Sequence, residues 1–152
     1  ATLKEILALE AAKKYDDPRY EELLVPFYEA HILRRPIMEW PEQVLRAFVR
    51  HINKKVYTPM QGPSEMGASG ILVDWDRCAD LKKITVPTLV IGARHDTMDP
   101  TFMETMSRSF PRGEYLYLAN GSHMAMYDDQ AAYFAGLLAW LHKVDTAPAA
   151  KP

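Results

Sequence analysis

The chain has 152 residues, of which 48% are hydrophobic and 25% charged, and this is the size and composition of one globular domain with a sizeable core. Its formal net charge is −2 and its 18 Lys and Arg residues are scattered, which argues against nucleic acid or an anionic membrane as a partner. The single cysteine, Cys78, cannot form an internal disulfide, so a cytoplasmic location is expected. The chain begins with Ala1 and not with Met, which indicates a processed product or one chain of a split protein.

Residues 2 to about 57 carry apolar residues at helical spacing. The pattern predicts a helix near the start of the chain and a second helix that begins at Pro18, with Asp17 as its N-cap. A third helix is expected after Pro41, with an apolar face formed by Val44, Leu45, Phe48, Val49 and Ile52. Residues 58–70 contain five Pro and Gly residues and are expected to form an ordered loop between two subdomains.

The second half of the chain alternates between strand and helix patterns. A short helical stretch at 78–83 precedes a strand over 86–92, which is apolar on both faces, as in a buried parallel sheet. A helix is expected from Asp99 through Phe110, a second strand over 114–119, and a final helix from 128 or 129 to about 144. One side of this last helix would carry Phe134, Leu137, Leu138 and Leu141. The alternation predicts a parallel sheet covered by helices, and since two strands are too few for a stable sheet, further strands must come from elsewhere.

Titratable side chains follow both predicted strands. Asp96 comes after the first strand and His123 after the second. Because the carboxyl ends of parallel strands lie at one edge of a sheet, a carboxylate and an imidazole are expected side by side there. Together they would form the acid and base members of a nucleophilic triad.

Each of these residues also has a plain structural interpretation. An Asp after a strand can be a turn residue or a helix N-cap, as we expect for Asp99 before Pro100. A histidine that follows Gly-Ser can be an ordinary surface loop residue. The combination of the two, with Asp96 framed as Gly-x-x-x-Asp-x-x-x-Pro, favours the catalytic interpretation.

Several motifs resemble one known family. The segment 86–140 contains Pro-Thr-Leu-Val-Ile-Gly, His-Asp-Thr-Met-Asp-Pro and Gly-Ser-His-Met-Ala-Met-Tyr-Asp-Asp, and these resemble the C-terminal part of the proline iminopeptidases, which are α/β-hydrolases. Upstream, Val-Tyr at 56–57, Met-Gln-Gly-Pro-Ser-Glu-Met at 60–66 and Asp-Trp-Asp at 74–76 resemble the junction between the cap and the core of that family.

The resemblance implies an α/β fold, namely the C-terminal part of an α/β-hydrolase preceded by part of a helical cap. Residues 1–66 would form the C-terminal portion of the cap domain and the cap–core junction. Residues 67–145 would form the C-terminal part of the core, a mostly parallel sheet with flanking helices. The tail at 146–152 has no core-forming pattern and is expected to be disordered.

The resemblance also assigns roles to three residues. Asp96 matches the triad acid, His123 matches the general base, and Glu65 matches a junction carboxylate that binds the free amino group of the substrate. A charge-assisted hydrogen bond to the cationic amine would suit an exopeptidase, although Glu65 taken alone could equally be a solvated loop acid. Some relatives place a second acid after the triad Asp, where this chain has Thr97. Part of the amine recognition is therefore absent or comes from another part of the protein.

The nucleophile is not found in this chain. Family members carry serine in Gly-x-Ser-x-Gly after an earlier strand, and none of the five serines here has that frame. Cys78 is a poor substitute, because it lies in a helical stretch without a nearby base. The expected partner is therefore an N-terminal half that carries the serine, and the expected substrate is a peptide with a free N-terminal proline.

Two other interpretations remain open. The chain could be part of another α/β-hydrolase, such as an amino-acid amidase or an esterase with the same triad, or it could be a non-catalytic interaction domain that keeps the fold without the serine. No CxxC or HExxH motif occurs and the histidines are not spaced as ligands, so neither a metal nor a cofactor is implied.

Overall fold

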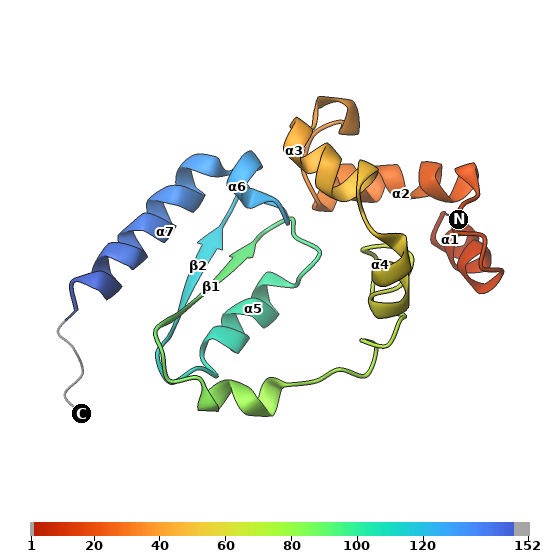
Figure 1. Cartoon of the computed structure of the whole chain (residues 1–152). Coiled ribbons are helices and arrows are strands. Elements are labelled where there is room, and N and C mark those ends of the chain that lie inside the picture. Colours follow the sequence, from red (N-terminus) through yellow and green to blue (C-terminus); the bar gives the residue numbers. More distant parts are fainter. Residues whose placement is uncertain (1, 148–152) are drawn as a thin grey trace. The chain divides into compact units, whose positions relative to one another are not determined.

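The computed structural model describes residues 2–147 and divides the chain into two compact units, Ala1–Trp75 and Asp76–Pro152. The first unit is helical, and the second contains a small parallel sheet with helices (Figure 1). Of the tail predicted at 146–152, residues 148–152 lie outside the described part. Thr146 follows the last helix as its C-cap.

The first unit begins with the two predicted amphipathic helices, α1 (Thr2–Ala11) and α2 (Pro18–His31). Asp17 is the N-cap of α2 and accepts a hydrogen bond from the Arg19 N–H at 3.0 Å, so the predicted helix start is confirmed. The two helices pack through a core made of Ile6, Tyr20, Leu23 and Leu24. The Tyr20 hydroxyl also donates to Glu10 of α1 at 2.7 Å.

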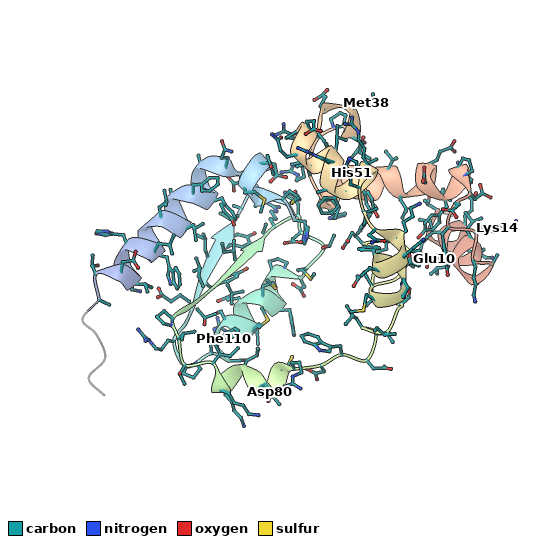
Figure 2. The ribbon with its side chains drawn as sticks, in the orientation of Figure 1. Glu10, Lys14, Met38, His51, Asp80 and Phe110 are labelled. Carbon is teal, nitrogen blue, oxygen red and sulfur yellow. The ribbon has the colours of Figure 1, made fainter. Side chains whose placement is uncertain are left out.

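The third predicted helix begins after Pro41 as expected, but it changes character along its length: α3 (Glu42–Leu45) continues directly as a five-residue π-helix η2 (Arg46–Arg50). A 3₁₀ turn η1 (Ile37–Glu39) precedes it, and a separate helix α4 (Lys54–Met60) follows. The π-helix shifts the apolar positions, so Val44 is buried but Val49 is 52% exposed. α4 also continues into the predicted loop as far as Met60, with Pro59 in its last turn. Met38 of η1 is exposed and projects into solvent (Figure 2).

The second unit is built on two parallel strands. After the 3₁₀ helix η3 (Cys78–Lys83), β1 (Thr88–Ala93) pairs with β2 (Gly113–Leu118), from Thr88 opposite Gly113 to Ala93 opposite Leu118. β1 begins two residues later than predicted, because Pro87 has no N–H to donate to a strand ladder. The predicted parallel pair is confirmed, with each strand displaced by one or two residues.

Helices cover both faces of this pair. α5 (Pro100–Ser107) lies on one face, where the Tyr115 hydroxyl donates to the Pro100 carbonyl at 2.9 Å. α7 (Gln130–Asp145) lies on the other, where a Cβ added to Gly136 would come 2.6 Å from the Leu116 side chain. Successive strand residues point to opposite faces, which agrees with the arrangement in Figure 1. A short helix α6 (Ala125–Asp128) precedes α7.

One helix prediction in this unit is wrong in detail. α5 ends at Ser107 and not at Phe110, since Pro111 disfavours helical backbone in the residue before it. In α7 three members of the predicted apolar side, Phe134, Leu138 and Leu141, are 42%, 60% and 40% exposed, whereas Leu137 is half-buried. The face of α7 that contains Gly136 and Trp140 lies against β2. Gly136 has no side chain and so admits Leu116 of that strand, and the Trp140 indole N–H donates to Glu114 at 3.1 Å.

Among the described residues, no helix combines the length and the apolar character needed to cross a membrane.

Candidate active site

The two loops that carry the predicted acid and histidine are joined by backbone hydrogen bonds. They leave the carboxyl ends of β1 and β2, where the Arg94 N–H donates to the Leu118 carbonyl at 3.0 Å. One residue further on, the His95 N–H donates to the Gly121 carbonyl at 3.0 Å. The strand register therefore continues into the loops and brings Asp96 next to His123.

Asp96 and His123 form a direct hydrogen bond. The Nδ1 atom of His123 lies 2.9 Å from Oδ1 of Asp96, and the two side chains are 31% and 10% exposed. The same carboxylate oxygen accepts the Met98 N–H at 3.1 Å and the Thr97 hydroxyl at 3.2 Å. An ionised Asp that accepts from Nδ1–H leaves Nε2, on the opposite edge of the ring, as the basic nitrogen of the imidazole.

The electrostatics keep this carboxylate ionised. Burial raises the pKa of the Asp96 carboxyl, but hydrogen bonds from His123, the Met98 N–H and the Thr97 hydroxyl, together with the charge of His123, outweigh burial. The net pKa therefore lies below its usual value. Asp96 is thus suited to hold one imidazole tautomer and to stabilise an imidazolium.

The neighbouring serine of the histidine is not arranged as a nucleophile. Ser122 is only 1% exposed, and its hydroxyl donates to Asp128. The hydroxyl of Thr97, the next residue after Asp96, donates to the Asp96 carboxylate and supports it. Among the described residues there is no group of three His, Cys, Asp or Glu side chains that could hold a metal ion.

Glu65 belongs to the first unit and is held there by tyrosines from two helices. The Tyr57 hydroxyl of α4 donates to Oε1 of Glu65, and the Tyr28 hydroxyl of α2 forms a hydrogen bond with the Glu65 backbone. Ser64, the preceding residue, is buried and bonds to the hydroxyl of Tyr20. This is an ordered carboxylate on a built support, and a free loop acid would not have these contacts.

A cavity of about 310 Å³ lies beside Glu65 within the first unit. Its wall combines Tyr28, Tyr57 and Glu65 with apolar side chains that include Leu24, Phe48 and Ile52. Burial, followed by the hydrogen bond and the charge of Glu65, raises the pKa of Tyr57, so this hydroxyl remains a protonated donor. A half-buried carboxylate in a mostly apolar wall is the kind of group that binds a cationic amine.

Tyr57 was not singled out by the sequence pattern as a site residue. It lies on α4, and the chain turns back at Gly62, where φ is 121°, before it reaches Glu65. Contacts made across such a turn have no periodic signature, so only the Val-Tyr element of the junction motif pointed to this position.

The parallel strands, the covering helices and the acid–histidine pair at the strand ends define an α/β-hydrolase core, and the expected fold class is confirmed by solved structures. The crystal structure of VinJ matches with a TM-score of 0.85 and 30% identity, over 94% of this chain and 48% of that one. The crystal structure of proline iminopeptidase from Mycobacterium smegmatis matches with a TM-score of 0.76 and 26% identity, over 95% and 48%.

Sequence comparison identifies the relatives more narrowly. The chain is 50% identical over 144 residues to the proline iminopeptidase of Flavobacterium johnsoniae, which covers 94% of the chain and 48% of that protein. It is 49% identical over 147 residues to the proline iminopeptidase of Elizabethkingia meningoseptica, covering 95% and 48%. No family model matches. The chain is therefore a homologue of the proline iminopeptidases, and it spans about half the length of the curated relatives it matches.

Proposed function

We propose that this chain is part of a serine aminopeptidase that releases an N-terminal residue, preferentially proline, from peptides. The observation that carries the proposal is the hydrogen-bonded pair of Asp96 and His123 at the ends of adjacent parallel strands, in a homologue of half a proline iminopeptidase. The serine and the oxyanion-binding N–H groups would be supplied by an N-terminal half of the same hydrolase.

In this mechanism each residue of the chain has a defined task. His123 removes the proton from the attacking serine hydroxyl and then donates it to the departing amine, so that an acyl-serine remains for hydrolysis by water. Asp96 fixes the imidazole tautomer and stabilises the imidazolium. Glu65 accepts a charge-assisted hydrogen bond from the substrate ammonium group, which restricts cleavage to the first residue.

Two features of the second unit support the proposal that it packs against an N-terminal half of the same hydrolase. In the described residues the sheet has only two strands, so each strand has one edge with unpaired backbone groups. The apolar stripe on α7 formed by Phe134, Leu138 and Leu141 is exposed, and exposed stripes of this kind mark an interaction surface. The exposed thiol of Cys78 fits a reducing compartment such as the cytoplasm.

The test uses a hybrid in which this chain replaces the matched part of the Flavobacterium johnsoniae proline iminopeptidase. If the Glu65 carboxylate pairs with the substrate ammonium group, Glu65→Gln leaves that cation poorly compensated, at a cost of roughly 2–5 kcal/mol. The kcat/KM for a proline-arylamide should then fall by about one to three powers of ten. Hydrolysis of an uncharged aryl ester should change little, because the triad is untouched.

Glu21→Gln is the matched control, since Glu21 lines the same cavity on α2 but has no proposed task. It should leave both substrates unaffected. Equal losses on both substrates in Glu65→Gln would mean that Glu65 supports the fold or the triad. Rapid ester turnover without release of proline by the unmutated hybrid would favour an esterase, and a folded hybrid with no hydrolysis of either substrate would favour a non-catalytic interaction domain.

A further inference from the structure

The loop that carries His123 is held from its far end by two acidic residues. Residues 119–124 connect β2 with α6, and the two acids follow at the end of α6. Oδ1 of Asp128 accepts the Ser122 N–H at 3.0 Å, and its Oδ2 accepts the Ser122 hydroxyl. Oδ2 of Asp129 accepts the Asn120 N–H at 3.2 Å. Both acids lie in a segment that the triad assignment does not use.

The Asp128 contact is placed to control the direction of the histidine ring. Ser122 is 1% exposed, and a single peptide unit joins it to His123. Both oxygens of one carboxylate bind Ser122, which fixes the backbone plane as well as the side chain at this position. Charge-assisted hydrogen bonds of this type are among the stronger ones in proteins.

Helix capping does not explain this carboxylate. Asp128 is the last residue of α6, and α7 begins at Gln130 with Asp129 as its N-cap. Asp128 therefore lies at the end of α6, and its carboxylate binds back to the loop that precedes this helix, six residues earlier in the chain. The contact therefore closes the histidine loop on itself.

We infer that Asp128 is a positioning residue for the triad, which holds the imidazole of His123 against Asp96 by binding both the N–H and the hydroxyl of Ser122. The geometry stands by itself, and only its use in catalysis rests on the proposed function. The 2.9 Å bond between Nδ1 and Oδ1 requires the ring to stay in place, and a displacement of about 1 Å can cost roughly 100-fold in rate.

The experiment compares Asp128→Ala, Asp128→Asn and Ser122→Ala in the hybrid enzyme, with an aryl ester and a proline-arylamide as substrates. Asp128→Ala should lower kcat by about 100-fold on both substrates, with KM nearly unchanged, because the histidine serves both reactions. Asp128→Asn keeps an oxygen for the Ser122 N–H and should recover a large part of this loss. Ser122→Ala keeps its N–H and should lose less than Asp128→Ala.

Asp99→Ala is the control for a purely structural effect. Asp99 is the N-cap of α5 and accepts the Thr101 N–H at 2.8 Å, so its removal should lower the melting temperature without lowering kcat. The second readout is the low-field proton NMR signal of the His123 Nδ1–H, which should weaken or shift in Asp128→Ala and persist in Asp99→Ala.

This NMR signal also separates the inference from the proposed function. If the unmutated hybrid hydrolyses neither substrate, the proposed function fails, while the signal still reports whether Asp128 holds the ring. A normal kcat together with an unchanged Nδ1–H signal in Asp128→Ala would overturn the inference, and so would an unchanged signal in an inactive hybrid.

Discussion

Replacing Asp96 by Asn tests the triad with the smallest change in shape. Asn keeps an oxygen that can accept the Met98 N–H, which Asp96 now accepts at 3.1 Å, so the loop can keep its conformation. The substitution removes the negative charge next to the imidazole. Oδ1 accepts both the Met98 N–H and the His123 Nδ1–H, so an amide that keeps its oxygen there loses only the charge, whereas a flipped amide turns its NH₂ toward Nδ1. In that arrangement Nδ1 must be the acceptor, and the ring then carries its proton on the wrong nitrogen for a general base.

The size of the loss can be estimated from the geometry. The pair is joined at 2.9 Å with side-chain exposures of 10% and 31%, which is a partly buried environment. Two unit charges about 4 Å apart interact by about 4 kcal/mol at an effective dielectric constant of about 20. An energy of that size, present in the transition state and absent before it, corresponds to about a thousandfold in kcat. A loss of about 10⁴-fold is the precedent in the serine-protease triad.

The assay is the release of arylamine from a proline-arylamide by the hybrid enzyme at saturating substrate. Asp99→Asn is the matched control, because the same chemical change is made three residues away at a helix N-cap. This control should keep its kcat and nearly all of its stability, because Asn caps a helix about as well as Asp. A kcat within about threefold of normal in Asp96→Asn, or an equal loss in Asp99→Asn, would refute the assignment of Asp96 as the triad acid.

Three further predictions concern the amine site, acid stability and packing. Tyr57→Phe removes the hydroxyl that donates to Glu65. It should raise KM for a proline-arylamide by about fivefold, since one hydrogen bond is worth about 1 kcal/mol. An unchanged KM in steady-state kinetics would contradict this. Because the folded-state pKa of Asp96 lies below its usual 3.8, its stabilising contribution is present above that value and lost as the pH falls through the folded pKa. Urea unfolding should therefore show a stability loss below about pH 4 that is smaller in Asp96→Asn, and equal losses would contradict the pKa shift. A Cβ added at Gly113 would lie 1.9 Å from a backbone oxygen at the end of α5, whereas one added at Gly67 meets nothing within 4 Å. Gly113→Ala should therefore lower the free energy of unfolding, measured by thermal unfolding, by about 1–3 kcal/mol, and Gly67→Ala should change it very little. Similar melting temperatures in the two variants would argue against this packing.

The strand ends were predictable because they depend on local pattern and on a general rule of sheets. Two apolar runs separated by a helix must lie parallel, and their carboxyl ends then lie at one edge. This is why Asp96 and His123 could be paired across 27 residues of chain. The helix starts at Pro18 and Pro100 were equally local, since each depends on an Asp N-cap that precedes a proline.

The missed features depend on contacts that no periodic pattern encodes. The face that α7 turns toward β2 depends on the small size of Gly136, which admits Leu116, and the apolar spacing alone does not indicate it. Tyr57 and Asp128 act through contacts with Glu65 and Ser122 across a turn or a loop. Their partners become visible only once the backbone has folded, because neither spacing matches a helix or a strand.

Whether the chain completes a proline-releasing hydrolase can be measured as the release of proline from a proline-arylamide by three samples at equal concentration. These are the 152-residue chain alone, the hybrid with the remaining half of the Flavobacterium johnsoniae enzyme, and the same hybrid with His123→Ala. We expect release by the hybrid only, with the chain alone and the His123→Ala hybrid both near background. Turnover by the chain alone would contradict the need for another half, and undiminished turnover in the His123→Ala hybrid would contradict the assignment of the general base.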